Sequence, residues 1–169
     1  MNLFWSRVLT NQDWLNNALN VQKFPISKLT PTSHAALVEC ILAYYVGTEV
    51  EYPEKIAKLF VDSEKIAWVL TNLLSNAIHY SKENSRIIIG AQQTGDVVEM
   101  FVQDFGKGID PRYHESIFDR YFRVPGTKVQ GSGLGLSISK DFIEAQNGTL
   151  TVESEVGKGS KFIIRFNVK

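Results

Sequence analysis

The stretch 97–104, VVEMFVQD, decides the fold, because apolar side chains recur at every second position as in a half-buried β-strand. Even-numbered positions share one face of this predicted strand: Val98, Met100 and Val102. Odd-numbered positions share the other face: Glu99, Phe101 and Gln103. Thr94-Gly95-Asp96 supplies turn residues just before it and predicts a hairpin with a second strand over 86–92.

Helices and further strands are predicted on both sides of this hairpin. Asp62 is a suitable N-cap for a helix with an apolar stripe at helical spacing. The stripe consists of Ile66, Leu70, Leu73, Leu74 and Ala77. A later helix from about Leu134 to Gln146 is stopped by Asn147-Gly148. Alternating apolar residues predict two more strands, over 149–155 and 160–168.

The residues before position 47 predict two more helices. Apolar residues at helical spacing indicate one helix over 1–23, ended by Phe24-Pro25, and another over 32–46, ended before Gly47. Together these elements predict an α+β fold. It is a two-layer sandwich in which a mixed, mostly antiparallel sheet is covered on one face by about three helices.

The composition is that of one soluble globular domain, with 169 residues, 44% hydrophobic and 21% charged. Lysine plus arginine and aspartate plus glutamate number 18 each, and zero net charge argues against nucleic-acid binding. The single cysteine, Cys40, excludes an intrachain disulfide and a thiolate metal cluster. The longest apolar run, Cys40–Val46, is too short to span a bilayer, and the N-terminus is no secretory signal. No direct membrane insertion of this chain is therefore expected.

Two asparagines stand four residues apart on the helix that follows Asp62. Asn72 and Asn76 share a face, and His79 and Tyr80 extend it. A carboxamide oxygen can bind Mg²⁺, which takes few protein ligands and completes its shell with water and phosphate oxygens. Taken alone, the pair is more typical of side chains that hydrogen-bond a nearby turn.

Asp104-Phe105-Gly106-Lys107-Gly108-Ile109 places a carboxylate at a strand end with two glycines after it. The carboxylate could accept a hydrogen bond from an exocyclic amine while the glycines let a flat ring lie against the backbone. The same residues fit a tight turn in which Asp104 hydrogen-bonds its own backbone. The motif alone does not decide between the two.

A second glycine motif, Gly131-Ser132-Gly133-Leu134-Gly135-Leu136, runs into a helix and is typical of a phosphate site. It is not a Rossmann fingerprint, because a loop precedes it, and not a Walker A motif, because Ser132 stands where lysine is required. Between the two motifs, Phe118 and Phe122 could fix a loop to the core and Arg123 could reach phosphate. That segment alone also fits an ordinary amphipathic turn.

In this order, the motifs closely resemble the ATP-binding catalytic domain of sensor histidine kinases. Its superfamily also holds the gyrase, Hsp90 and MutL ATPases (GHKL) and has the Bergerat fold. The resemblance covers roughly residues 24–169 and implies a protein-histidine kinase that transfers the γ-phosphoryl group of Mg·ATP. The matching segments are Asn72–Ala77, Asp104–Ile109, Phe118–Arg123, Gly131–Leu136 and Glu153–Ser160.

The resemblance also implies residue roles. Asn76 would hold Mg²⁺, Asn72 would assist at the phosphates, and Asp104 would accept from the adenine amino group. Arg123 would contact the γ-phosphate and begin a mobile lid that ends near Gln130. The implied catalytic residues are Asn72 and Arg123. The implied nucleotide-binding residues are Asn72, Asn76, His79, Tyr80, Asp104, Gly106, Gly108, Ile109, Arg123, Gly131, Ser132, Gly133, Leu134, Gly135 and Leu136.

Two positions depart from the family pattern, and a third distinguishes the chain from the ATPase relatives. His79 stands where the family usually has lysine, and a histidine side chain is mostly uncharged at pH 7. Phe105 replaces the usual asparagine, and either change could lower nucleotide affinity. Asn72 occupies the position of the general-base glutamate of the ATPase relatives. Because an amide cannot take a proton, phosphoryl transfer is favoured over hydrolysis.

The family's phosphoacceptor motif, a histidine followed by an acidic residue on a dimerising helix, has no convincing match. Of His34, His79 and His114, only His114 precedes an acidic residue, and it lies between the nucleotide motifs. Residues 1–23 weakly resemble the end of a dimerisation helix. We therefore expect residues 24–169 to be a catalytic fragment of a longer kinase.

The resemblance implies ATP and ADP, the parent kinase's phosphoacceptor histidine domain and a response regulator as partners. It implies a cytoplasmic location, in a family whose members are commonly anchored in the plasma membrane. Two alternatives stay open. An anti-sigma-type serine kinase shares this ATP site, and a degenerate domain could act as a docking module. Asn72 disfavours a third, an ATP-driven clamp like that of the gyrase group.

Overall fold

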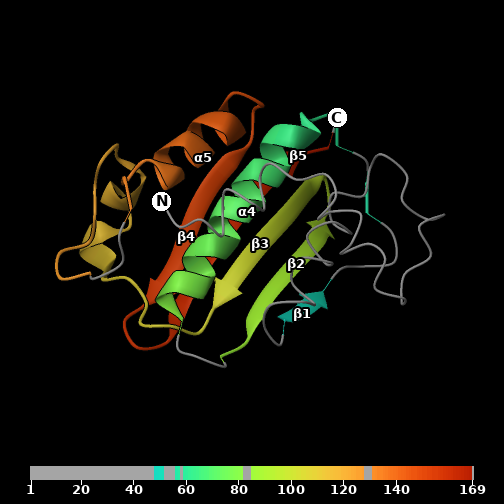
Figure 1. The fold of residues 1–169 in the computed structure, drawn as a ribbon. Coiled ribbons are helices and arrows are strands. Elements are labelled where there is room, and N and C mark those ends of the chain that lie inside the picture. The colour runs from blue at the N-terminus through green and yellow to red at the C-terminus, as the bar shows by residue number, and fades with distance from the viewer. Residues whose placement is uncertain (1–47, 52–55, 58, 82–84, 128–130, 169) are drawn as a thin grey trace, which may run out of the picture.

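The computed structural model describes residues 48–51, 56–57, 59–81, 85–127 and 131–168 (Figure 1). The strands are β1 (Thr48–Glu51), β2 (Ile87–Thr94), β3 (Val97–Asp104), β4 (Thr149–Glu155) and β5 (Gly159–Asn167). The α-helices are α4 (Ser63–Tyr80) and α5 (Gly135–Glu144). Two short 3-10 turns, η2 (Pro111–Tyr113) and η3 (Ser116–Phe118), lie between β3 and α5.

The strands form one sheet in the order β1-β2-β3-β5-β4. Only β1 and β2 are parallel, and the other neighbouring pairs are antiparallel. Figure 1 shows α4 and α5 side by side over one face of this sheet. The predicted α+β two-layer sandwich is therefore confirmed. The sequence does not predict β1, because four residues are too few to reveal a period. The predicted helices over 1–23 and 32–46 lie outside the described residues.

The main core fills the space between the sheet and the two helices. Val69 and Leu73 of α4, Ile143 of α5 and Ile164 of β5 are each 0% exposed. Burying such a side chain stabilises the fold by about 1.5–3 kcal/mol. The whole predicted stripe of α4 is buried, as the helical spacing requires.

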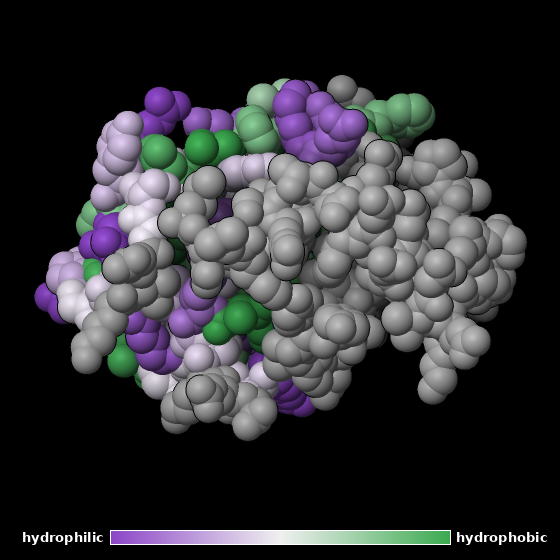
Figure 2. All heavy atoms as spheres, in the orientation of Figure 1, coloured by the Kyte–Doolittle hydropathy of each residue, from purple (hydrophilic) through white to green (hydrophobic). Residues whose placement is uncertain are grey.

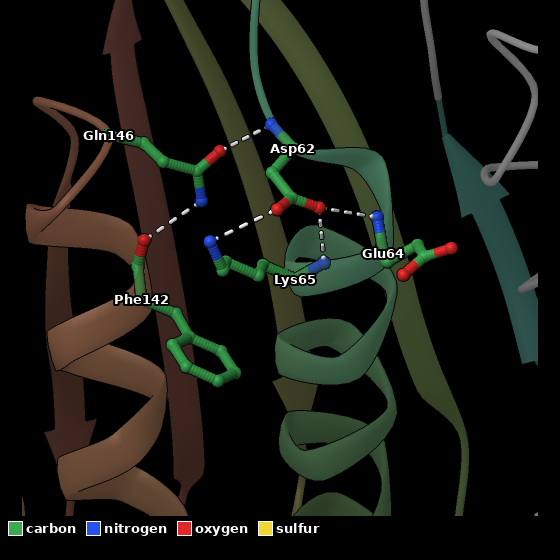
Figure 3. A network of polar contacts seen from close by, with 5 residues as sticks. All are labelled: Asp62, Glu64, Lys65, Phe142 and Gln146. Carbon is green, nitrogen blue, oxygen red and sulfur yellow. Dashed lines mark hydrogen bonds and ion pairs between the residues drawn. The ribbon is translucent and has the colours of Figure 1, made fainter.

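The two helices are antiparallel and joined by a polar network at one end (Figure 3). The Asp62 carboxylate caps α4 by accepting from the backbone N–H groups of Glu64 and Lys65, each at 3.1 Å. The Gln146 side chain accepts from the Asp62 backbone N–H at 2.5 Å and donates to the Phe142 carbonyl at 2.8 Å. Gln146 therefore connects the end of α5 to the start of α4.

The other face of the sheet is less polar than the alternation of β3 predicts. Ile88, Phe101 and Ile163 form a second, smaller buried cluster there. Phe101 shares this face of β3 with Glu99 and Gln103, and its ring covers Gly90 on the neighbouring strand. The Lys161 ammonium lies 4.1 Å from the centre of the Phe101 ring. An aromatic ring can therefore be buried between a glycine and a lysine stem.

The surface on the helical side mixes polar and apolar residues. Among the coloured residues of Figure 2, hydrophobic side chains lie in small groups between hydrophilic ones. Within the described residues, neither helix combines the length and the apolar character that a bilayer crossing needs.

Candidate functional site

A cavity of about 300 Å³ lies between α4, the end of β3, the start of α5 and the segment that joins β3 to α5. It is lined by all but two of the predicted nucleotide-binding residues. Those present are Asn72, Asn76, His79, Tyr80, Asp104, Gly108, Ile109, Arg123, Gly131, Ser132, Gly133, Gly135 and Leu136. The two that do not line it are Gly106 and Leu134. In Figure 1 the joining segment, coloured yellow to orange, lies at one side of the sheet beside α5.

Asp104 is the buried acid of the cavity, with 4% of its surface exposed. Its carboxylate accepts a hydrogen bond from the Gly106 backbone N–H at 2.8 Å. Burial raises the pKa of Asp104 above its usual value, while the N–H groups of Gly106 and Ser160 oppose that rise. The tight-turn interpretation is therefore confirmed, and Asp104 also lines the cavity, while its bond to an exocyclic amine stays a prediction.

The loop after Asp104 is attached to the turn between β4 and β5. The Lys107 carbonyl accepts from the Gly157 N–H at 2.7 Å, and the Ile109 N–H donates to the Ser154 hydroxyl at 2.8 Å. Gly108 has φ +68°, and a Cβ there would lie 2.0 Å from the Glu155 carbonyl oxygen. Gly108 is thus required for loop packing as well as for access to the cavity.

The two predicted asparagines have different surroundings. The Asn72 amide donates to the Ser139 hydroxyl at 2.9 Å, and Ser139 in turn donates to the Gly135 carbonyl at 2.9 Å. Ser139 is 0% exposed, so this chain of bonds joins α4 to the first turn of α5. Within the described ranges, no hydrogen bond occupies the half-buried Asn76 carboxamide, which faces the cavity.

These surroundings suit Mg²⁺ only together with phosphate oxygens. Asn76 offers one neutral carboxamide oxygen, and the described part of the chain holds no group of three His, Cys, Asp or Glu side chains able to bind a metal. A magnesium ion commonly takes one or two protein ligands and completes an octahedral shell with water and phosphate. The residues present fit that kind of site.

The other end of the cavity is formed by the segment before α5. Tyr121 has the unusual φ of 65°, and its N–H donates to the Gly133 carbonyl at 2.9 Å. Gly133 has φ +70°, and a Cβ there would lie 2.8 Å from the Tyr121 carbonyl carbon. By contrast, a Cβ on Gly131 would meet nothing within 4 Å. Of the predicted lid, residues 128–130 lie outside the described ranges.

Several lining residues are absent from the predicted site. They are Ser75, Lys107, Ile117, Phe122, Val124, Ser160 and Phe162. Lys107 lies inside the first glycine motif, and its ammonium is 5.0 Å from the centre of the Tyr80 ring. Ser75 lies one turn before His79, and its hydroxyl is 3.3 Å from His79 Nδ1. Helical spacing from Asn72 and His79 could have indicated Ser75, but no local signal identifies Phe162.

A family model matches residues 61–169, and its description is histidine kinase-, DNA gyrase B-, and HSP90-like ATPase. The chain belongs to this ATPase family. Among curated proteins, the sensor protein SrrB of Staphylococcus aureus (strain NCTC 8325 / PS 47) is 38% identical over 107 residues. That match covers 62% of this chain and 18% of SrrB, so the chain spans less than a fifth of this relative.

Solved structures of this ATPase family's kinase members have the same fold. The catalytic domain of histidine kinase ThkA is 30% identical with a TM-score of 0.66, covering 85% of this chain and 93% of that one. The mycobacterial sensor histidine kinase MprB is 25% identical with a TM-score of 0.64, covering 79% and 89%. The predicted resemblance to a sensor histidine kinase ATP-binding domain is confirmed. The individual residue roles and the boundary at residue 24 stay predictions.

Proposed function

We propose that this domain binds Mg·ATP in the cavity between α4 and the segment before α5. It then donates the γ-phosphoryl group to a histidine on the phosphoacceptor domain of a sensor kinase. The observation that carries this proposal is one cavity lined by the buried Asp104 carboxylate, the Asn76 carboxamide and the first turn of α5. Among the described residues, the Asn76 carboxamide has no hydrogen-bond partner. Kinship with sensor histidine kinases supports the same reaction.

The Asp104 end of the cavity suits the adenine base. A carboxylate is an acceptor only, and the adenine amino group is a donor. A bond to a buried ionised group is stronger than one between neutral groups, because less water competes for it. The fixed loop after Asp104 keeps this acceptor in place before the nucleotide arrives.

The opposite end suits the phosphates. Gly135 and Leu136 line the cavity, and the first N–H groups of a helix have no partner within the helix. Such groups can bind an anion at the positive end of the helix dipole. Asn76 would hold the magnesium ion, which when bound neutralises phosphate charge. Arg123, which also lines the cavity, is the candidate for the γ-phosphate.

In the transfer, a ring nitrogen of the acceptor histidine forms a bond to the γ-phosphorus. The bond between that phosphorus and the β–γ bridging oxygen breaks, and ADP leaves with this oxygen. The acceptor's ring proton passes to a base that we place beside the acceptor. Because the Asn72 amide cannot take a proton and already donates to Ser139, water is poorly activated here and transfer is favoured over hydrolysis.

The response regulator and the cellular location follow from the same proposal. A response regulator would receive the phosphoryl group from the histidine, and the reaction would take place in the cytoplasm, where ATP is abundant. The relatives described above are a sensor protein and histidine kinases, which supports the histidine-kinase alternative over a serine kinase or a docking module.

Calorimetric titration of ATP and ADP, with and without Mg²⁺, tests the binding part of the proposal. We expect the unchanged chain to bind both nucleotides and Asp104→Asn to weaken both. Asn76→Ala should weaken ATP chiefly when Mg²⁺ is present, because only the metal-bound nucleotide uses that side chain. If the unchanged chain gives no binding heat at millimolar nucleotide, the proposal is wrong.

A phosphotransfer assay tests the reaction. The chain is incubated with γ-labelled ATP and an isolated phosphoacceptor domain of a sensor kinase, and the product is exposed to acid. Phosphohistidine is labile in acid, whereas phosphoserine is not, so an acid-stable product would favour the serine-kinase alternative. ATP binding with no product on any acceptor would favour a docking module.

A further inference from the structure

Lys107 is held at the mouth of the cavity by the backbone on both sides of it. Its carbonyl accepts from the Gly157 N–H at 2.7 Å. The following glycine packs against the Glu155 carbonyl, and Ile109 is bonded to Ser154. These contacts fix the start of the lysine side chain, which lines the cavity itself.

The Lys107 ammonium is not neutralised by a carboxylate of the described residues. Six ion pairs join lysines or arginines to acids there, and none of them includes Lys107. The ammonium lies 5.0 Å from the centre of the Tyr80 ring. The other basic side chains that line the cavity are His79 and Arg123, and the acid is Asp104.

Lys107 lies on the loop after Asp104, at the end of the cavity that suits adenine. We propose that it is nevertheless a nucleotide-binding residue, whose charge attracts the polyphosphate chain of ATP across the cavity and raises affinity more for nucleotides that carry more negative charge. This inference rests on the proposed function. A cation that has no acidic partner among the described residues is stabilised electrostatically when an anion enters the cavity. A flexible four-carbon stem lets its ammonium move from the Tyr80 ring toward a phosphate oxygen.

A second role would explain the same contact, because Lys107 could merely support the Tyr80 ring. The two roles differ in how they depend on ligand charge. A ring support affects adenosine and ATP alike, whereas an attraction to phosphate affects ATP most and adenosine not at all. The effect of an exposed charge also falls as salt screens it.

The test is calorimetric titration of adenosine, ADP and ATP into the full chain and into Lys107→Gln and Lys107→Arg. The matched control is Lys158→Gln, which removes the same charge from the adjoining turn, where Lys158 pairs with Glu155 outside the cavity. Thermal unfolding without nucleotide checks that all variants are folded.

We expect Lys107→Gln to lower the affinity for ATP by roughly three- to tenfold and the affinity for ADP by less. The affinity for adenosine should not change. Lys107→Arg should retain most of the ATP affinity, and Lys158→Gln should match the unchanged chain. The ATP effect should also shrink at high salt.

Equal losses for adenosine and ATP, no loss at all, or an equal loss in Lys158→Gln would each overturn the inference and leave the proposed function standing. If the unchanged chain binds none of the three ligands, the proposed function fails and the inference fails with it.

Discussion

The two ends of the cavity are built in opposite ways. At the Asp104 end, side chains and backbone are already joined to one another, and a Cβ on Gly108 would meet backbone at 2.0 Å. At the end before α5, a Cβ on Gly133 would also lie 2.8 Å from backbone, but one on Gly126 or Gly131 would meet nothing within 4 Å. The Asp104 end is therefore preformed, and the other end has room to change around Gly126 and Gly131 when a ligand enters.

The largest effect is expected from Gly108→Ala. The new methyl group would overlap the Glu155 carbonyl oxygen, and φ +68° is strained for alanine, so the loop must leave the β4–β5 turn. We expect a loss of about 3 kcal/mol or more in the free energy of unfolding, measured by denaturant titration. A loss below 1 kcal/mol would contradict the preformed character of this end.

Much of this preformed end could be predicted from the sequence. The strand over 97–104 and the cap at Asp62 follow from neighbours in the chain, and the structure confirms both. The Asp104 motif also correctly indicates an acid at the cavity. Its attachment to Ser154 and Gly157 could not be predicted, because those partners are nearly fifty residues away.

The different hydrogen bonding of Asn72 and Asn76 could not be predicted from the sequence either. Helical spacing places Asn72 and Asn76 on one face but does not indicate which of them Ser139 engages. The second apolar cluster was missed for a similar reason, since Phe101 is buried by residues of neighbouring strands.

The next effect concerns Asp104→Asn, which should weaken ATP and ADP by about 10–100-fold, the loss expected for a bond to a charged group. The pH dependence has a defined sign. Because the pKa of Asp104 is raised, the native chain takes up this proton more readily than the unfolded chain, and ionised Asp104 costs stability at neutral pH.

Nucleotide affinity of the unchanged chain should therefore fall with decreasing pH at higher pH values than an ordinary aspartate would cause. The free energy of unfolding of Asp104→Asn should be equal or greater near pH 7, and calorimetry with denaturant titration measures both quantities. If Asp104→Asn is less stable than the unchanged chain yet binds ATP with unchanged affinity, Asp104 is a structural residue and not the acceptor for adenine.

A smaller effect is expected from Ser139→Ala, which lies between the two ends. Removing its hydroxyl leaves the Asn72 amide and the Gly135 carbonyl without this partner. We expect a loss of about 1–3 kcal/mol in the free energy of unfolding. ATP affinity should fall more than adenosine affinity, because the displaced first turn of α5 lies where the phosphates would bind.

The matched control is Ser137→Ala, since Ser137 is also buried in α5 but its hydroxyl, among the described residues, bonds only the carbonyl of Leu134. If Ser139→Ala lowers the affinity for ATP and for adenosine equally, Ser139 does not act on the phosphate end of the cavity.

The smallest effect is expected from Gly131→Ala, since the added methyl group meets open space. The free energy of unfolding should stay within about 0.5 kcal/mol of the unchanged chain, as for most surface substitutions. A loss as large as that of Gly108→Ala would remove the difference between the two ends. Denaturant titration of both variants under one set of conditions makes the comparison.

The helix pair has a mechanical consequence for the cavity. Gln146 fastens the end of α5 to the start of α4, and Asn72 with Ser139 fastens the start of α5 about halfway along α4. A helix that is bonded to its neighbour at two separated points is hindered from rotating about its axis and from sliding along that neighbour. α5 is thus restrained against α4 at two points, so we expect a rearrangement on ligand binding to leave the pairing of these helices unchanged.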